Sequence, residues 1–350
     1  MSYIKPQFRN PQLPKNAVGY AKSDYEGVIS TLCAGCGHDS ISAAIVQACF
    51  ELDVEPHRIA KLSGIGCSSK SPNYFLNNSH GFNSVHGRMP SVATGANLAN
   101  RELLYLGISG DGDTASIGMG QFVHAIRRNL NMTYIVMNNG CYGLTKGQDS
   151  ATADAGSINK SGVVNPFDGI DLAGLALELG AAFVARSFSG DKSQLIPLIK
   201  AAMSHQGFAF IDVISPCVTF NNDPESNKSY DYGKDKEAPL HDIAFIQQFD
   251  EISVDYEPGA VQEVKMHDGP TILLRKLEES YDPTNRLAAL SRLEEARAQQ
   301  EFITGLLYFD EARPTLAELE NIVDTPLALL TEDRVRPSKE SLQKLMKDFM

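Results

Sequence analysis

The feature that most constrains the fold is an alternation of short apolar runs with helix-length segments. Strand-sized apolar runs occupy Arg58–Ser63, Leu103–Ser109, Thr133–Met137, Phe183–Arg186 and Phe208–Ile214. Segments with apolar residues at helical spacing lie around them, beginning at Asp39 and near Ile117 and spanning Asp171–Leu179 and Lys192–Met203. This alternation predicts an α/β fold with a doubly wound, mostly parallel sheet. Because such sheets bind ligands beyond the carboxyl ends of their strands, the loops after the first three runs are the predicted site.

The chain divides into four segments by composition. Residues 1–30 contain Pro6, Pro11 and Pro14 and are expected to form an extended arm, and residues 31–220 hold the α/β domain. Residues 221–310 are expected to form a C-terminal subdomain with a long polar loop at 221–239, a hairpin turning at 267–269 and a charged helix at 286–300. Residues 311–350 form a tail that we expect to end in an amphipathic helix.

Charge and hydropathy exclude several classes of protein. The 350 residues include 31 Lys and Arg against 43 Asp and Glu, a net charge of −12. Such a chain has no general attraction for nucleic acid or for an anionic membrane. No apolar run approaches the roughly 20 residues of a membrane span, and the start of the chain has no apolar signal-peptide region. We therefore expect a cytoplasmic protein with neither a nucleic-acid nor a membrane partner.

Acidic and amide side chains follow two of the predicted strands. Residues 110–113 read GDGD, and Asn138-Asn139 follow after one helix and one strand. GDGD alone is compatible with a tight acidic turn, and an EF-hand is excluded because Ser116 and Phe122 occupy its sixth and twelfth positions. If the two strand ends are neighbours, Asp111 and Asn139 can face one cation, together with a backbone carbonyl just after Asn139. Such oxygen ligands suit Mg²⁺ with phosphate and water completing its shell.

The six cysteines contain one close pair and two distant members of interest. Cys33 and Cys36 form a C-x-x-C, and Cys67 and Cys217 lie far along the chain. The pair alone is compatible with a redox site, half a zinc site or chance. Dispersed cysteines suit an iron–sulfur cluster equally well, since four thiolates need only meet in space. Cys49 lies on an apolar helical stripe and is expected to pack in the core.

Several motifs together resemble one family. GDG followed by a double Asn resembles the thiamine diphosphate motif. CAGCGH at 33–38, GIGCSSK at 64–70, HGR at 86–88, GDGD at 110–113 and NNGCYGLTKGQ at 138–148 occur in order. The chain thus resembles the β subunit of the 2-oxoacid:ferredoxin oxidoreductases over roughly residues 15–300. That resemblance implies the diphosphate-binding domain of the thiamine diphosphate-binding fold, with the N-terminal arm and C-terminal extension added to it.

The resemblance also implies the site residues. A 4Fe–4S cluster would be bound by Cys33, Cys36, Cys67 and Cys217. Mg²⁺ would be bound by Asp111, the Asn139 side chain and the Cys141 carbonyl. Thiamine diphosphate would be lined by Ile65, Gly66, Cys67, Ser68, His86, Gly112, Asp113, Gly143 and Leu144. The residues expected nearest the chemistry are Lys70, His86 and Leu144. Since Cys67 belongs to both sets, the cluster would lie close to the cofactor, as electron transfer between them requires.

Some of these residues also have simpler interpretations. Gly64 and Gly66 after a strand hint at a dinucleotide site, which Ser69 in place of a third glycine disfavours. His86 can be an ordinary turn histidine, and Lys70 a solvated lysine rather than a partner for a substrate carboxylate. His38, beside the C-x-x-C, is expected to support or cap that segment.

By the same resemblance, the function is oxidative decarboxylation of a 2-oxoacid to an acyl-CoA, with electrons passed through the cluster to ferredoxin. The reaction is reversible as CO₂ fixation. An α subunit would supply the pyrimidine-binding domain and a coenzyme A contribution, in an αβ heterodimer or a dimer of αβ pairs. Lys70 and the segment 144–146 favour 2-oxoglutarate, with pyruvate or broad specificity as the alternative. Two rivals stay open, a non-redox thiamine decarboxylase subunit and a non-catalytic iron–sulfur or zinc protein.

Overall fold

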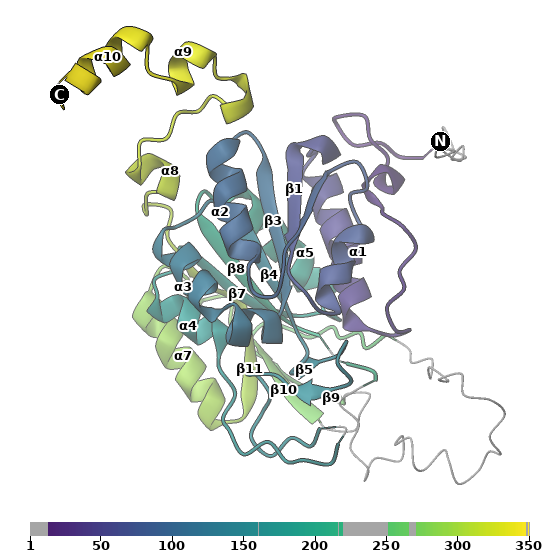
Figure 1. Cartoon of the computed structure of the whole chain (residues 1–350). Helices are drawn as coiled ribbons and strands as arrows, with labels where there is room; N and C mark the ends of the chain where they lie inside the picture. The colour runs from purple at the N-terminus through teal and green to yellow at the C-terminus, as the bar shows by residue number, and fades with distance from the viewer. Residues whose placement is uncertain are drawn as a thin grey trace.

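The chain forms one large mixed sheet. The computed structural model describes residues 13–159, 161–215, 217–219, 251–265, 271–347 and 349. Within these residues, nine strands pair in the order β2-β1-β3-β4-β8-β7-β11-β10-β9 (Figure 1). They are β1 (Ile59–Ser63), β2 (His80–Asn83), β3 (Leu104–Gly110), β4 (Met132–Asn138), β7 (Phe183–Phe188), β8 (Phe208–Ile214), β9 (Val261–Lys265), β10 (Thr271–Lys276) and β11 (Glu301–Phe309). The strands from β2 through β7 in this order are all parallel, which confirms the predicted fold class.

Helices cover both faces of this sheet, as a doubly wound fold requires. On one face lie α1 (Gly37–Glu51) and α5 (Lys192–Ser204). On the other lie α2 (Met89–Ala99), α3 (Met119–Arg127), α4 (Leu172–Glu178) and α7 (Arg286–Ala298). The sequence analysis did not predict α2.

The central strands are apolar throughout because both of their faces are buried. In β8, Phe208 and Phe210 join the core beneath α3, while Ala209 and Ile211 join the core beneath α1 and α5. The ring of Phe122 from α3 packs edge-on against Phe210, with 5.1 Å between the ring centroids. Edge-to-face contacts of this kind hold the helix layer at a defined place on the sheet.

The C-terminal strands extend the same sheet. Strand β11 pairs antiparallel with β7 and parallel with β10, and β9 pairs antiparallel with β10. The sequence analysis did not predict β11, and it placed the hairpin of β9 and β10 correctly. The turn of that hairpin at 267–269 and the polar loop at 221–239 lie outside the described residues. The described part of residues 251–310 therefore continues the central sheet.

Short elements complete the described chain. They are the 3₁₀ turns η1 (Lys22–Tyr25), η2 (Pro56–Arg58), η3 (Ser68–Asn73) and η5 (Leu327–Leu329), the π-turn η4 (Asp113–Ile117), the small strands β5 (Cys141–Tyr142) and β6 (Gln148–Asp149), and the helices α8 (Leu316–Leu319), α9 (Glu332–Val335) and α10 (Lys339–Lys347). Within the predicted N-terminal arm, the ring of Tyr25 is fully buried and its hydroxyl donates to the carbonyl of Val54 at 2.8 Å. The part of the arm that includes η1 therefore packs on the domain.

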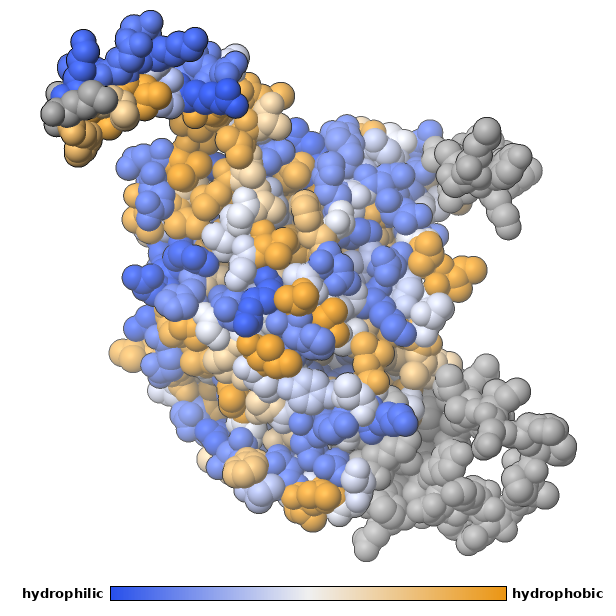
Figure 2. All heavy atoms as spheres, in the orientation of Figure 1, coloured by the Kyte–Doolittle hydropathy of each residue, from blue (hydrophilic) through white to orange (hydrophobic). Residues whose placement is uncertain are grey.

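The tail leaves the body of the domain. Helices α9 and α10 project beyond α2 in Figure 1, and every residue from 331 to 347 is exposed. Helix α10 has the predicted amphipathic pattern, with Leu342, Leu345 and Met346 each about half exposed, and apolar atoms gather on one side of the tail in Figure 2. None of the described helices has the length and apolar composition needed to cross a membrane.

Candidate active site

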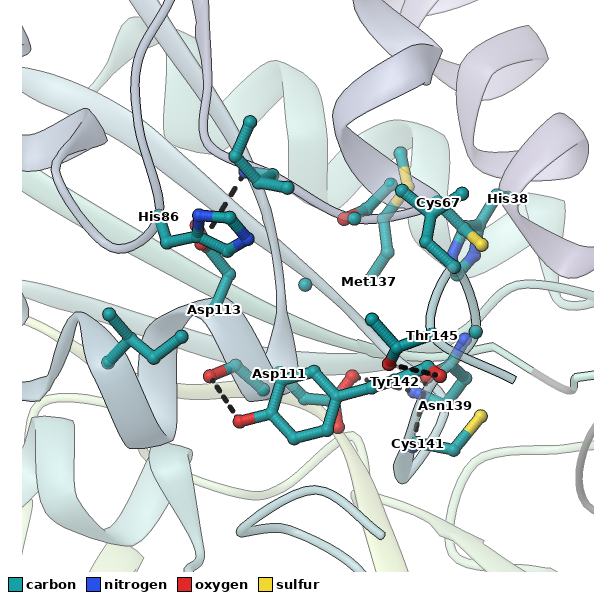
Figure 3. Close-up of a pocket in the computed structure, with 18 residues that line it drawn as sticks. His38, Cys67, His86, Asp111, Asp113, Met137, Asn139, Cys141, Tyr142 and Thr145 are labelled. Carbon is teal, nitrogen blue, oxygen red and sulfur yellow. Dashed lines mark hydrogen bonds between the residues drawn. The ribbon is translucent and has the colours of Figure 1, made fainter. Parts of the chain in front are cut away.

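A pocket opens at the carboxyl ends of β1, β3 and β4, where the sequence predicted the site (Figure 3). Its volume is about 510 Å³ with the open mouth included. The predicted cofactor and magnesium residues that line it are Ile65, Gly66, Cys67, Ser68, His86, Asp111, Gly112, Asp113, Asn139, Cys141, Gly143 and Leu144. Lys70, Cys33, Cys36 and Cys217 are not among the lining residues.

Six lining residues were not predicted as cofactor contacts. They are His38, Gly110, Ile117, Met137, Tyr142 and Thr145. Gly110, Tyr142 and Thr145 each adjoin a predicted residue in the chain, so for these three the neighbouring residue was the available signal. Met137 gave no such signal, because its position is that of an ordinary buried strand residue. It reaches the pocket only because β4 ends there.

Asp111 is the buried carboxylate of the pocket and only 1% exposed. Its Oδ2 accepts hydrogen bonds from the hydroxyls of Ser150 and, at 2.7 Å, Thr152. Its Oδ1 accepts from the backbone N–H of Asn139 at 3.3 Å. Burial raises the pKa of Asp111, and these donors oppose that rise. Within the described chain this carboxylate accepts from hydroxyl and N–H groups, so a bound cation would relieve its burial cost.

Asn139 lies beside Asp111 because β3 and β4 are parallel neighbours, with Gly110 opposite Met137. The Asn139 amide oxygen accepts from the backbone N–H of Cys141 at 3.1 Å, which closes a tight turn after the strand. This turn brings an amide oxygen and backbone carbonyls to the same strand end as the Asp111 carboxylate. A carboxylate, an amide and a carbonyl are the hard oxygen donors that suit Mg²⁺.

Asp113 holds three loops of the pocket together. Its Oδ1 accepts from the backbone N–H of Gly87 at 2.8 Å and of Ile65 at 3.4 Å, and its Oδ2 accepts from the Ser109 hydroxyl at 2.9 Å. Burial raises its pKa, while the Gly87, Ser109 and Ile65 donors and the nearby His86 lower it. Asp113 also begins the π-turn η4, a geometry found frequently at functional sites. Asp113, which was predicted as a cofactor contact, therefore also positions the loops that surround the pocket.

Two glycines are required by this packing. A Cβ on Gly64 would lie 1.9 Å from Oδ2 of Asp113. Gly87 has φ +66°, and a Cβ there would lie 2.5 Å from the backbone nitrogen of Gly118. At both positions glycine lets the backbone approach the facing residue more closely than a side chain would permit.

One buried polar group without a partner in the described chain belongs to a residue that lines the pocket. The Ser68 hydroxyl is buried and has no hydrogen-bond partner within the described chain. A buried hydroxyl without a hydrogen-bond partner is unusual unless a ligand or a water molecule supplies that partner. His86 and Leu144 lie at the mouth, where both are exposed.

The cysteines predicted to bind a cluster influence one another electrostatically. Burial raises the pKa of Cys36 to about 12, and Cys217 and Cys33 add to that rise. Burial also raises the pKa of Cys67, again with contributions from Cys217 and Cys33. The hydroxyl of Thr219 donates to the Cys33 sulfur at 3.1 Å. In the described part of the chain, no three His, Cys, Asp or Glu side chains are arranged to hold one metal ion.

Three neighbours of the cysteines define this region further. Contact with the Cys217 thiol, together with burial, raises the pKa of Cys141, so Cys141 lies between the strand-end turn and the cysteines. His38 is buried, its Nδ1 lies 2.7 Å from the Ser215 hydroxyl, and burial lowers its pKa to about 4. Lys70 lies three residues after Cys67, and its ammonium partly offsets the rise in the pKa of Cys67.

The family comparison defines the class of protein. The family described as "Thiamine pyrophosphate enzyme, C-terminal TPP binding domain" matches residues 64–213. This segment contains every residue that lines the pocket except His38. The pocket therefore lies, apart from His38, within the segment that matches a thiamine pyrophosphate-binding domain.

Individual relatives show which thiamine pyrophosphate enzymes this chain is similar to. A 2-oxoacid:ferredoxin oxidoreductase subunit beta of Sulfolobus is 44% identical over 191 residues, which are 54% of this chain and 63% of the relative. A 2-oxoglutarate synthase subunit KorB of Methanocaldococcus jannaschii is 38% identical over 192 residues, 54% of this chain and 69% of the relative. A solved 2-oxoglutarate:ferredoxin oxidoreductase from Magnetococcus marinus, with 2-oxoglutarate, coenzyme A and succinyl-CoA bound, is 30% identical. Its TM-score is 0.70, over 93% of this chain and 94% of that chain.

The chain belongs to the family of 2-oxoacid:ferredoxin oxidoreductase β subunits, which confirms the resemblance. It spans slightly less than two thirds of the length of the Sulfolobus relative.

Proposed function

We propose that the pocket binds thiamine diphosphate and Mg²⁺, with Asp111, the Asn139 side chain and the Cys141 carbonyl as the protein ligands of the metal. The observation that carries this proposal is the meeting of Asp111 and Asn139 at one pair of strand ends, inside the matched family segment. The buried Asp111 carboxylate would gain a counter-charge, and the Ser68 hydroxyl would gain a partner. Gly112 and Gly143 leave the backbone accessible to the diphosphate.

We further propose that Cys33, Cys36, Cys67 and Cys217 bind a 4Fe–4S cluster. The support is that Cys217 and Cys33 both raise the pKa of Cys36 and of Cys67, together with the position of Cys67 in the pocket wall. Four thiolates form a suitable donor set for such a cluster. With Cys67 common to both sites, the cluster would lie within a short electron-transfer distance of the cofactor.

The proposed reaction is the oxidative decarboxylation of a 2-oxoacid to an acyl-CoA. Bound thiamine diphosphate supplies the carbon nucleophile and the electron sink, which the protein cannot supply itself. The chain's own residues position that chemistry. Asp113 holds the loops that carry Ile65 and Gly87, and His86 and Leu144 border the entrance that a substrate would use. The reaction releases two electrons that ferredoxin accepts singly, and a strong reductant drives it toward CO₂ fixation.

Partner chains follow from the same proposal. The Sulfolobus relative is named as a subunit beta and the Methanocaldococcus relative as a subunit KorB, so we propose an α subunit that carries the pyrimidine-binding domain, in an αβ heterodimer or a dimer of αβ pairs. Coenzyme A is the proposed acyl acceptor, as it is bound in the Magnetococcus structure.

For the substrate we propose 2-oxoglutarate, with Lys70 pairing its distal carboxylate. Lys70 lies in η3, three residues after the pocket-lining Cys67, and its charge opposes the rise in the pKa of Cys67. Replacement of Lys70 by Ala should lower kcat/KM for 2-oxoglutarate at least tenfold and leave that for pyruvate nearly unchanged. Lys339→Ala in the exposed tail is the control. An unchanged 2-oxoglutarate preference in Lys70→Ala would remove Lys70 from this role.

Metal analysis tests the cluster. Anaerobically purified protein should contain about four irons and four acid-labile sulfides per chain. About one zinc without sulfide would instead favour a non-redox thiamine enzyme with a structural zinc site.

Cofactor binding tests the pocket. Binding of thiamine diphosphate should require Mg²⁺ and should be lost in Asp111→Ala, whereas the exposed Asp168→Ala should bind as the wild type does. Mg²⁺-independent binding, or binding that survives in Asp111→Ala, would contradict the assignment.

A further inference from the structure

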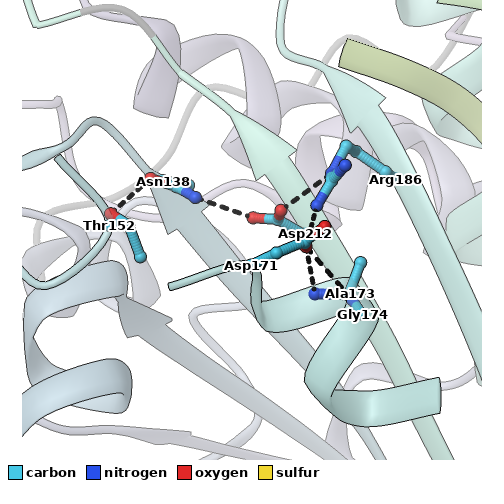
Figure 4. A network of polar contacts seen from close by, with 7 residues as sticks. All are labelled: Asn138, Thr152, Asp171, Ala173, Gly174, Arg186 and Asp212. Atoms are coloured by element: carbon cyan, nitrogen blue, oxygen red, sulfur yellow. Dashed lines mark hydrogen bonds and ion pairs between the residues drawn. The ribbon is translucent and has the colours of Figure 1, made fainter. Parts of the chain in front are cut away.

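A line of polar side chains runs from Asp111 of the proposed magnesium site to the buried Arg186, and Figure 4 shows its part from Thr152 to Arg186. The Thr152 hydroxyl lies 2.7 Å from Oδ2 of Asp111 and 3.1 Å from the amide oxygen of Asn138. The Asn138 amide nitrogen donates to Oδ1 of Asp212 at 3.1 Å. The Nε of Arg186 donates to Oδ2 of the same carboxylate at 3.0 Å. Every pair along the line is within hydrogen-bond distance, Thr152 has one proton for its two acceptors, and the line ends at Asp111.

The far end of this line is held rigidly. Arg186 in β7 and Asp212 in β8 are direct partners in the strand register, and they are 6% and 1% exposed. Arg186 also donates through Nη2 to Asp171, which caps α4 by accepting from the backbone N–H groups of two of its first residues at 3.0 and 3.1 Å. A guanidinium bound by two carboxylates has few alternative orientations, so Oδ1 of Asp212 is presented at a fixed place.

The fixed acceptor determines how Asn138 lies. Because Asp212 accepts only from the amide nitrogen, the amide oxygen of Asn138 must point to Thr152. The single proton of Thr152 then faces two acceptors, Asn138 and Asp111, while the Ser150 hydroxyl also donates to Asp111. A cation bound to Asp111 would weaken that carboxylate as a hydrogen-bond acceptor. The Thr152 hydroxyl would then donate to the amide oxygen of Asn138.

Core stability alone gives little reason for this arrangement. A buried ion pair is often no better than apolar residues of the same size for stability. Its distinctive effect here is to orient Asn138, the residue directly before the proposed ligand Asn139. The backbone carbonyl of Asn138 is also held, accepting from the Ser215 N–H at 2.7 Å.

We propose that Arg186 and Asp212 are positioning residues for the Mg²⁺–diphosphate site, acting through Asn138 and Thr152 on Asp111 and on the turn that carries Asn139. This inference rests on the proposed function of the pocket. Residues that orient metal ligands without touching the metal usually change its affinity by roughly 10–100-fold when they are replaced.

The test measures Mg²⁺-dependent binding of thiamine diphosphate by calorimetry on the complete αβ complex, with the melting temperature of the cofactor-free complex recorded beside it. Asp212→Asn puts an amide where Asn138 and Arg186 both donate, so the apparent Kd for Mg²⁺ should rise roughly 10–100-fold. Asn138→Ala removes the middle link at a half-buried position and should raise the Kd similarly. Arg292→Met breaks the half-exposed ion pair with Glu278 and should leave the Kd unchanged.

The outcomes separate the possibilities. Kd values within twofold of wild type in both variants would overturn the inference, even if the melting temperatures fall. If Asp212→Asn does not fold, Asn138→Ala decides by the same criterion. Wild-type complex that fails to bind thiamine diphosphate in a Mg²⁺-dependent manner would overturn the proposed function and this inference together.

Discussion

Replacement of Gly64 by alanine tests how the pocket loops are held. Gly64 follows β1, and the three atoms nearest to a Cβ placed there all belong to the Asp113 carboxyl group, at 1.9, 2.8 and 3.1 Å. No real Cβ tolerates the first two distances, so the carboxylate must move. The backbone of Gly64 is not in the left-handed region, so the substitution adds no backbone strain of its own.

The cost follows from the bonds that Asp113 would lose. Its two shorter bonds, from Gly87 N–H at 2.8 Å and Ser109 hydroxyl at 2.9 Å, have an ionisable acceptor. Each such bond contributes about 1.5–3 kcal/mol. The displaced carboxylate regains part of this from water in the pocket, so we expect Gly64→Ala to lower the free energy of unfolding by about 3 kcal/mol. In an Asp113→Ala background the clashing atoms are gone, and the same substitution should cost less than about 1 kcal/mol.

The assay is a double-mutant cycle measured by denaturant unfolding of the wild type, the two single variants and the double variant. The expected coupling between positions 64 and 113 is about 2 kcal/mol or more. A Gly64→Ala penalty of equal size in both backgrounds would show that the clash with Asp113 is not its cause. A neutral Gly64→Ala would refute the description of the loop packing itself.

Three further outcomes follow from the described residues. Burial lowers the pKa of Lys61 to about 8 from 10.5, so between these pH values the unfolded chain binds more protons than the folded one. Wild type should therefore gain up to about 3 kcal/mol relative to Lys61→Met as pH rises through that window, and a constant difference in unfolding free energy would contradict this. In Gly112→Ala the new Cβ would lie 2.4 Å from the Tyr142 ring, so thiamine diphosphate affinity measured by calorimetry should fall more than tenfold and recover partly in Gly112→Ala/Tyr142→Ala. The Arg313 guanidinium donates to backbone carbonyls at the C-terminal ends of α3 and α4. Arg313→Lys cannot form this fork and should destabilise by about 2 kcal/mol in denaturant unfolding, whereas Arg334→Lys in the exposed tail should not.

The sheet could be predicted from the sequence where strands are buried on both faces. Phe208–Ile214 was predicted with the bounds that β8 has, because six apolar residues with a single Asp among them are typical of a parallel strand that is buried on both faces. Strand β2 and helix α2 lacked such a signal. All residues of β2 are exposed, and α2 is rich in small and polar residues. Strand β11 was missed because it directly follows the charged helix α7 and pairs with residues more than 100 positions earlier.

The position of the pocket could be predicted because residue types that are unusual for strand ends follow the apolar strands. Glycines and carboxylates directly after apolar strands are hard to explain by packing, and parallel strand ends meet at one edge. The supporting residues give no such sign. Arg186 and Asp212 lie inside apolar strands 26 residues apart, and only the parallel register of β7 with β8 pairs them. Which polar residue of a strand serves the site depends on the strand order. That order is a property of the whole sheet, so such residues become visible only when the fold itself is known.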